Sequence, residues 1–290
     1  MTDHTDYHEQ DQSTGSPHPE MAKDGLIVQV RPFCGRISRA QADAIASLAA
    51  AHGNGLLDLT DSATLQIRGV SRQSHPALIN GLKMMRLIDP DPDVEIRRNI
   101  LVTPFWRPQD EVEILANQLT AEIAANDASG LRDEIRFAVD TGRTPVLQND
   151  VADIRLETDA GGSLLLVADG MKTGKPVTTD SAVAETLKLA RWFSETAEDK
   201  VDRLKSLVAK SVIPAGAFVP RQQGAYNPVP GYTPNGALVG LASGQMHVET
   251  LSSLAKHGGL RLTPWRLILV ESARELPEID GIETDSGNRL

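Results

Sequence analysis

Arginines beside short apolar stretches are the residues of this sequence with the clearest chemical potential. Arg31 and Arg68 each follow such a stretch, and Arg98 precedes another. A guanidinium stays charged and pairs bidentately with a carboxylate, so several of them on one surface would bind a ligand that carries many carboxylates. Taken singly, each arginine equally suits a surface salt bridge that contributes little to stability. The elements that carry these arginines decide between the two interpretations.

Composition limits the kinds of function to be considered. The chain has 290 residues, 40% of them hydrophobic, and a net charge of −10, which suits an ordinary protein of about two domains. The acidic balance argues against a general nucleic-acid binder but leaves room for a local anion site. No apolar run reaches the roughly 18 residues of a membrane span, and residues 1–20 lack the features of a secretory signal. We therefore expect a cytoplasmic protein without a membrane partner.

Cysteine and histidine usage predicts no protein-held metal. Cys34 is the single cysteine, so the chain forms no internal disulfide and cannot hold an iron–sulfur cluster, which normally needs about four thiolates. We interpret Cys34 as a loop residue rather than a reactive thiol. Three of the seven histidines lie in residues 1–22, a polar stretch that we expect to be a disordered tail.

The first arginines fall on a recognisable series of elements. Gly25–Val30 has the β-branched, apolar character of a strand, and Ser38 is a suitable N-cap for an alanine-rich helix. Gln66 and Arg68, two residues apart, would share one face of a strand. The predicted order of strand, helix, two strands and helix is that of a ferredoxin-like half-unit; after the first strand it comprises residues 39–52, 56–59, 64–68 and 75–87.

The middle of the chain mixes helices and strands. Helices are predicted over residues 111–125, 181–193 and 197–209, and strands over 135–139, 154–158 and 163–168. Residues 214–236 are rich in Pro, Gly and Asn and are typical of a connection. A strand over 237–242 and a helix over 249–257 follow.

An internal repeat organises the two ends of the chain. The tetrads that begin at Leu57 and at Leu260 both have the pattern L-x-L-T, and each follows a helix and a glycine. We interpret them as two half-units that pair about a pseudo-two-fold axis around an inserted domain. The predicted fold is α+β, with a tail (1–22), first half-unit (23–90), inserted domain (91–213), linker (214–236), second half-unit (237–276) and C-terminal tail (277–290).

These motifs resemble the nitrite/sulfite reductase family with its ferredoxin-like half-domains. The stretches that carry the resemblance are residues 30–35, 55–70 and 97–100. Within that family the chain looks most like the precorrin-3B synthases, on residues 135–140, 152–156 and 262–266. The resemblance covers residues 25–275 in order.

The resemblance implies a tetrapyrrole site between the two domains but assigns no catalytic residue. The ligand would be an anionic tetrapyrrole, precorrin-3A or sirohaem, and the family also uses a 4Fe-4S cluster with sirohaem or non-haem iron. The residues that would contact the tetrapyrrole are Arg31, Thr60, Gln66, Arg68, Arg98, Asn99, Arg136 and Arg266.

Two local departures from the family pattern remove positive charge. Ser62 stands where the family usually has an arginine, and Glu134 stands where it has a lysine. A carboxylate at that place would repel an anionic macrocycle unless it has moved out of the site. We also expect the C-terminal iron–sulfur domain of the family to be missing. Three explanations agree with this expectation: a truncated protein, a split enzyme whose second chain carries the cluster, and a cluster-free protein.

The leading functional interpretation is an oxidoreductase similar to precorrin-3B synthase. In that family a monooxygenase reaction hydroxylates precorrin-3A and forms a lactone in aerobic cobalamin biosynthesis. Without a cluster domain, the chain alone would be inactive. Two alternatives stay open: a non-catalytic tetrapyrrole-binding module, and a fragment of a sulfite or nitrite reductase.

Overall fold

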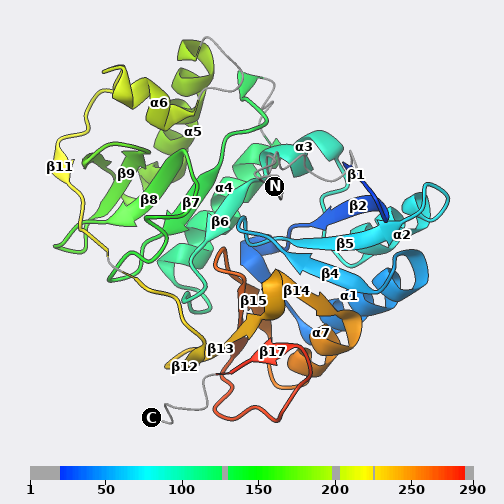
Figure 1. The fold of residues 1–290 in the computed structure, drawn as a ribbon. Helices are drawn as coiled ribbons and strands as arrows, with labels where there is room; N and C mark the ends of the chain where they lie inside the picture. Colours follow the sequence, from blue (N-terminus) through cyan, green and yellow to red (C-terminus); the bar gives the residue numbers. More distant parts are fainter. Residues whose placement is uncertain (1–19, 126–129, 198–202, 225, 285–290) are drawn as a thin grey trace, which may run out of the picture.

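The computed structural model describes residues 20–125, 130–197, 203–224 and 226–284. Helices and strands alternate through three sheets, which confirms the predicted α+β class. The two half-units form one side of the molecule in Figure 1, and a domain built on the third sheet forms the other. Among the described residues, no helix has both the length and the apolar character needed to cross a membrane.

The first half-unit begins with a β-hairpin, and a capping box at Ser38 begins its first α-helix. The Ser38 hydroxyl accepts the backbone N–H of Gln41 while the Gln41 side chain accepts that of Ser38, a capping box that begins the alanine-rich helix. The elements are β1 (Glu20–Ala22), β2 (Gly25–Val30), η1 (Phe33–Gly35), β3 (Arg36–Ile37), α1 (Arg39–His52), β4 (Leu56–Leu59), β5 (Leu65–Val70) and α2 (His75–Met84).

The second half-unit repeats this order. Both units carry a 3-10 turn with two residues at positive φ, Cys34 and Gly35 in the first and Ser243 and Gly244 in the second. The elements are β13 (Gly236–Leu241), η3 (Ala242–Gly244), β14 (Gln245–His247), α7 (Val248–Ala255), β15 (Leu260–Leu262) and β16 (Leu267–Glu271).

Each half-unit donates one short strand to the other unit's sheet. β3 pairs with β15, and β14 pairs with β4, which gives the sheet orders β1-β2-β5-β4-β14 and β12-β13-β16-β15-β3. The helices that follow the exchanged strands, α1 and α7, pack against each other. The pairing of the two repeats predicted from the L-x-L-T tetrads is therefore confirmed, with the exchange of strands as an added feature.

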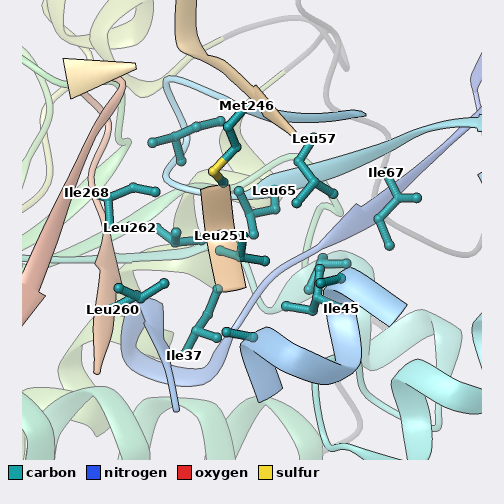
Figure 2. Packing of buried hydrophobic residues seen from close by; sticks show 14 of the residues in the cluster. Ile37, Ile45, Leu57, Leu65, Ile67, Met246, Leu251, Leu260, Leu262 and Ile268 are labelled. Atoms are coloured by element: carbon teal, nitrogen blue, oxygen red, sulfur yellow. The ribbon is translucent and has the colours of Figure 1, made fainter. Parts of the chain in front are cut away.

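The inner faces of both sheets and the helices share one core. Ile37, Ile45, Leu57, Leu251 and Leu260 are completely buried, and Figure 2 shows side chains from the two half-units interleaved there. Burying such a side chain stabilises the fold by about 1.5–3 kcal/mol. Because the core draws on residues from both ends of the chain, neither sheet covers its apolar face alone.

The inserted domain has a six-stranded sheet with two long helices packed on one face. β6, β7 and β8 are parallel, and the remaining strands antiparallel. The elements are α3 (Pro92–Arg97), β6 (Ile100–Val102), α4 (Glu111–Ala125), β7 (Phe137–Asp140), β8 (Ile154–Thr158), β9 (Leu164–Ala168), β10 (Thr173–Pro176), α5 (Thr179–Thr196), α6 (Leu204–Ala209) and β11 (Val219–Pro220).

Among the differences from the sequence-based expectation, four concern the expected tails, the expected linker and one expected helix. Residues 20–22 of the expected tail form β1, paired with β2, while residues 1–19 lie outside the described residues. The expected linker contains β11 and β12 (Gly231–Thr233), and the expected C-terminal tail contains β17 (Ile282–Glu283), which pairs with β13. The helix expected over 197–209 is α6 alone, with Arg203 as its N-cap and residues 198–202 undescribed. Strands of two or three residues leave no periodic pattern to read.

Candidate functional site

The first sheet carries a row of polar side chains on the face that points away from the core. Gln29 lies opposite Gln66, Gln66 opposite Asp58, and Asp58 opposite Gln245, so the row crosses four strands. Residues directly opposite one another in adjacent strands have their side chains on the same face. We call these four residues the polar row. Exposure rises along it, from the buried Gln29 to the exposed Gln245.

The equivalent row of the second sheet is different. By the same register, Leu238, Leu269, Arg261 and Arg36 lie side by side. Leu238 and Leu269 are buried with Phe105 packed against them, and the Arg261 guanidinium stacks on the Trp106 ring at 3.9 Å. The inserted domain therefore covers this face of the second sheet. Of the two related faces, the one with the polar row has the character of a ligand surface.

Thr60 and Gln66 belong to the edge of the polar row. The Thr60 hydroxyl lies 2.8 Å from that of Thr64, and the Gln29 amide donates to Thr64 at 2.7 Å. Thr60 therefore holds the turn between β4 and β5, while Gln66 stays half-buried on the open face. Thr263 holds the corresponding turn of the second half-unit through the backbone of Leu267.

Arg31 continues the face of Gln29 past the end of β2 and enters a buried ionic cluster. Its Nη1 donates to the main-chain oxygen of Glu95 at 2.8 Å. Arg98, the C-cap residue of α3, donates from Nη2 to the oxygen of Arg31 at 2.7 Å and to Glu95 Oε2 at 2.5 Å. The exposed fractions are 5%, 3% and 1% for Arg31, Arg98 and Glu95. Glu95 thus binds both guanidiniums, Arg98 through its carboxylate and Arg31 through its main-chain oxygen, and one negative charge faces two positive charges beside the polar row.

The electrostatics of this cluster favour an additional anion. Burial, against the opposing charge of Glu95 and together with the positive charges of Arg98 and Arg136, lowers the pKa of Arg31 to about 10. The Nε atoms of Arg31 and Arg98 are buried and have no hydrogen-bond partner among the described residues. Phe33 supports the Arg98 guanidinium from one side, 4.1 Å from the ring centroid.

Arg136 brings the inserted domain to the same neighbourhood. It directly precedes β7, and its backbone N–H donates to Asp153 at 3.0 Å. Arg203 also pairs with Asp153, at 2.7 Å, and donates to the main-chain oxygen of Glu134. The Glu134 side chain is exposed. The Glu134 carboxylate, at the position where the resemblance places a lysine, thus faces solvent.

Arg68 and Arg266 lie apart from this cluster. Arg68 follows the face of Gln66 but pairs with Asp24 at 3.0 Å and Asp58 at 3.1 Å, and its hydrogen bond lowers the pKa of Asp24. Arg266 is exposed at positive φ in the turn after β15, where its side chain approaches Gly244. Both predictions stay untested as ligand contacts, and Arg68 has two carboxylates to satisfy its charge.

Asn99 joins the two parallel strands at the edge of this region. Its main-chain oxygen accepts the N–H of Phe137 at 2.8 Å, and its side chain is half-buried. The structure therefore brings together Arg31, Arg98 and Arg136, places Thr60 and Gln66 on the neighbouring sheet face, and leaves Arg68 and Arg266 in separate surroundings.

Sequence reasoning missed two contributors to this region. Glu95 lies on a six-residue helix that has no apolar periodicity, so nothing marked it as the counter-ion. Trp265, Tyr226 and Phe105 form an aromatic cluster, with ring centroids 4.9–6.3 Å apart, although their positions in the sequence are distant. The Trp265 Nε1 also donates to Asp150 at 3.2 Å.

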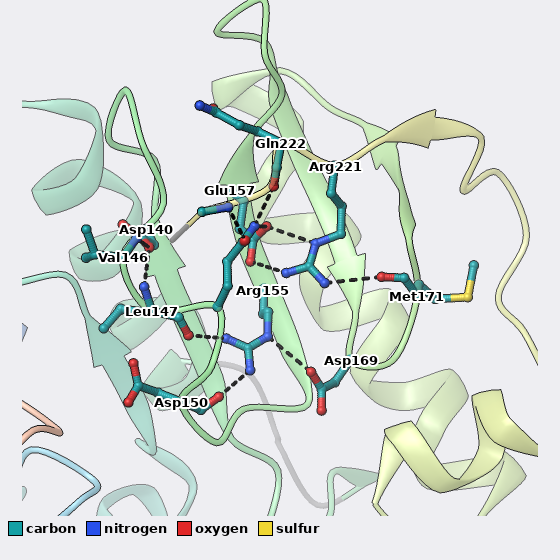
Figure 3. A network of polar contacts seen from close by, with 12 residues as sticks. Asp140, Val146, Leu147, Asp150, Arg155, Glu157, Asp169, Met171, Arg221 and Gln222 are labelled. Atoms are coloured by element: carbon teal, nitrogen blue, oxygen red, sulfur yellow. Dashed lines mark hydrogen bonds and ion pairs between the residues drawn. The ribbon is translucent and has the colours of Figure 1, made fainter. Parts of the chain in front are cut away.

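The far face of the inserted sheet is closed by a polar network. Arg155 is 2% exposed and pairs with Asp169, and Arg221 pairs with Glu157 at 2.6 Å (Figure 3). Arg155 also donates to the main-chain oxygen of Leu147 at 2.8 Å. Buried charges that are fully paired in this way fix the loop and the segment around β11 against the sheet. They are structural rather than ligand-facing.

The part of the chain that the structure describes contains no group of side chains suited to a protein-held metal. Among the described residues, no group of three or more His, Cys, Asp or Glu side chains is placed to hold a metal ion. Cys34 is half-buried, and burial raises the pKa of its thiol to about 11, which disfavours the thiolate that a metal needs. A single cysteine does not suit a four-thiolate cluster.

Comparisons with known proteins agree with this architecture. Residues 18–85 match the nitrite/sulfite reductase ferredoxin-like half domain. A precorrin-3B synthase of Sinorhizobium sp is 26% identical over 197 residues, which are 68% of this chain and 38% of that protein. The structure of the NirA protein of Mycobacterium tuberculosis superposes with a TM-score of 0.59 at 12% identity, over 86% of this chain and 54% of that one.

This chain thus spans about half or less of the length of both relatives, and the structural match concerns the fold. The half-domain match includes the strands that carry Gln29, Asp58 and Gln66 of the polar row, and the structural match includes most of the chain. The chain thus contains a match to the ferredoxin-like half domain of nitrite/sulfite reductases, is similar in sequence to a precorrin-3B synthase, and shares its fold with NirA.

Proposed function

We propose that this chain is the tetrapyrrole-binding part of an oxidoreductase similar to precorrin-3B synthase. The observation that supports it most strongly is the buried pair of Arg31 and Arg98, with a net positive charge and two Nε–H groups that lack partners. Precorrins and sirohaem carry many carboxylates around the ring, and charge-assisted hydrogen bonds from guanidinium are the strongest available to them. The name of the curated relative supplies the reaction class.

The polar row would lie under the macrocycle. Gln66 and Gln245 offer amide donors to peripheral carboxylates, and Arg136 approaches from the inserted domain. The family reaction that we assign is the monooxygenase step on precorrin-3A, and no residue of this chain is assigned as its catalyst. Binding and orientation of the substrate are the roles that these side chains suit.

The residues present fit an anionic macrocycle but not an iron–sulfur cluster. Sirohaem or another iron group, when bound, would supply redox chemistry next to the arginines. A 4Fe-4S cluster, as the family uses, would have its thiolates from outside these 290 residues, since Cys34 stands alone. We propose that a cluster-bearing partner supplies the electrons.

A binding module without catalysis is the second candidate, and Ser62 favours it. Ser62 occupies the place of the family arginine in the turn held by Thr60, and its hydroxyl approaches Asp61 at 3.4 Å. Loss of a cation there leaves fewer groups to stabilise charge on a reacting ligand. This candidate predicts tetrapyrrole binding without turnover, even with the cluster-bearing partner present.

The test is a titration of the purified chain with sirohaem, followed through the Soret band. Gln66→Glu adds a negative charge to the open face without touching the core, and should weaken binding by about tenfold, or about 1.4 kcal/mol. Arg98→Lys tests the buried pair directly. Arg39→Gln, which changes an exposed arginine on α1, is the matched control and should leave the affinity unchanged.

The titration can support or contradict the proposed tetrapyrrole site. Saturable binding that Gln66→Glu and Arg98→Lys weaken, and Arg39→Gln does not, supports the proposed site. Absence of binding, or equal affinity for all four proteins, would remove the support for it. Turnover of precorrin-3A with a cluster-bearing partner then separates the enzyme from the binding module.

A further inference from the structure

A cavity lies at the edge of the inserted sheet where two parallel strands end. β6 and β7 run side by side in the same direction, so the residues that follow them meet at one edge. The cavity there has a volume of about 280 Å³, and its walls include Phe105, Trp106 and Val146. Ligands of open α/β sheets bind outside the carboxyl ends of parallel strands. This cavity is separate from the residues assigned to the tetrapyrrole.

Asp140, the last residue of β7, lines the cavity with one oxygen to spare. Its carboxylate is 2% exposed, and Oδ2 accepts the N–H groups of Val146 at 2.6 Å and Leu147 at 2.8 Å (Figure 3). Oδ1 is buried and has no partner within hydrogen-bond distance and angle among the described residues, although the Thr103 side chain, also in the cavity wall, interacts with this carboxylate. The hydroxyl of the neighbouring Thr141, also in the cavity wall, is likewise buried without a partner.

The charges around the cavity select against an anion. The N-terminus of α4 faces it, but Asp110 already caps that helix through the N–H of Glu113 at 3.0 Å. Glu111 adds a second carboxylate and Asp140 a third, against the single exposed guanidinium of Arg143. A phosphate or carboxylate would meet this excess of negative charge, whereas a hydrogen-bond donor with positive charge would be attracted.

Burial of the Asp140 carboxylate favours a positively charged hydrogen-bond donor. Desolvation raises the pKa of Asp140 to about 6, and the hydrogen bonds from the backbone of Leu147 and Val146 and from the Thr103 side chain only partly offset it. At neutral pH the carboxylate is ionised in surroundings that solvate it poorly. A cation in contact with Oδ1 would relieve that penalty, and the aromatic side chains of Phe105 and Trp106 would receive an apolar body.

We propose that this cavity binds a small organic cation, an apolar or aromatic group with a protonated amine whose N–H groups donate to Asp140 Oδ1 and Thr141 Oγ1. The site does not depend on tetrapyrrole binding, and the proposal goes beyond the function proposed above. Its ligand would be recognised by one charged donor and a flat apolar body together.

The experiment uses the full chain, labelled with nitrogen-15, and benzylamine as the probe. Amide resonances of Val146 and Leu147 report on the site directly, because both N–H groups donate to Asp140. We expect saturable shifts of these resonances with benzylamine, at least tenfold weaker binding of the neutral benzyl alcohol, and no binding of benzoate. Benzylamine that fails to saturate, or binds no better than benzyl alcohol, means a water-filled cavity and overturns the proposal.

Two variants and a control test whether Asp140 Oδ1 and Thr141 Oγ1 accept the hydrogen bonds of the ligand. Asp140→Asn keeps an oxygen for the loop N–H groups and puts an amide in place of Oδ1, so benzylamine affinity should fall by tenfold or more. Thr141→Val removes only the hydroxyl and should lower affinity several-fold in a folded protein. Asp43→Asn, on the exposed face of α1, removes an equal charge elsewhere and should change nothing. Unchanged affinity in both cavity variants would also overturn the proposal.

Discussion

Glu95→Gln tests whether one carboxylate holds the buried arginine pair. Glu95 accepts Arg98 Nη2 at 2.5 Å and the N–H of Asp89 at 2.8 Å, and its main-chain oxygen accepts Arg31. Glutamine keeps the shape and one acceptor oxygen but removes the negative charge. Two buried guanidiniums would then lie together without a counter-ion.

The expected cost follows from the burial of all three side chains. Removing one partner of a buried ion pair destabilises a protein by about 3–5 kcal/mol. Because glutamine still accepts one hydrogen bond, and the main-chain oxygen of residue 95 still holds Arg31, we expect the lower end, about 3 kcal/mol. At roughly 2–4 °C per kcal/mol for a chain of this size, the Tm should fall by about 6–12 °C.

The same change should act in the opposite direction on ligand binding. The net charge of the three groups rises from one positive charge to two, so an anionic macrocycle meets a stronger field. A unit charge acting over about 10 Å at an effective dielectric constant near 20 contributes roughly 1.5 kcal/mol, or about tenfold in affinity. Lower stability with higher sirohaem affinity is a signature that a merely structural cluster would not give.

The assay pairs thermal and urea unfolding, followed by circular dichroism, with the Soret titration. Glu249→Gln, at an exposed position on α7, is the matched control and should change stability by less than about 0.5 kcal/mol. If Glu95→Gln unfolds no more easily than this control, the charge is not what holds the pair. If stability falls but sirohaem affinity also falls or stays constant, the arginines do not face the ligand.

Three further changes have expected outcomes. Burial raises the pKa of Asp150 to about 6, so the protonated carboxyl contributes stability at low pH that is lost as the pH rises through 6. Asp150→Asn should therefore stabilise the protein by about 1 kcal/mol at pH 7.5, after discounting for partial exposure, and by almost nothing at pH 4. Urea unfolding at the two pH values measures the difference. Gly259→Ala would place a Cβ 2.2 Å from Glu271 Oε2, and thermal unfolding should show a loss of about 1–3 kcal/mol. Ser62→Arg restores the family cation and should strengthen sirohaem binding several-fold in the Soret titration.

Long regular elements were predictable from the sequence because their signals are local. The α4 helix has the predicted bounds, Glu111–Ala125, and Ser38 is the predicted N-cap of α1. The L-x-L-T tetrads identified the two half-units, since each threonine holds the same turn in the structure. The exchanged strands were not predictable. Arg36–Ile37 has two residues, and its partner, Leu260, is more than two hundred residues away.

The candidate site was predictable only as a set of cations. The motif positions of Arg31 and Arg98 led to the cluster, but Glu95, which binds both, did not show, because α3 is too short for a periodic pattern. The pairing of Arg68 with Asp24 and Asp58 depends on register and on a hairpin, both of which form through tertiary contacts. The charged residues in a sequence indicate whether a site binds anions or cations. The net charge of the site depends on neighbouring residues that are close only in the folded structure.

The exchange of β3 and β14 between the half-units has a consequence for how the chain reaches this structure. β3 must pair with β15, with Arg36 opposite Arg261, and β14 must pair with β4, with Gln245 opposite Asp58, before either sheet is complete. Contacts between distant segments slow folding because the intervening chain must first be ordered. The parallel strands of the inserted domain are close in sequence and can form earlier. Two separate half-units that exchanged these strands would form an intertwined dimer, so this chain has the topology of such a dimer joined through its insertion.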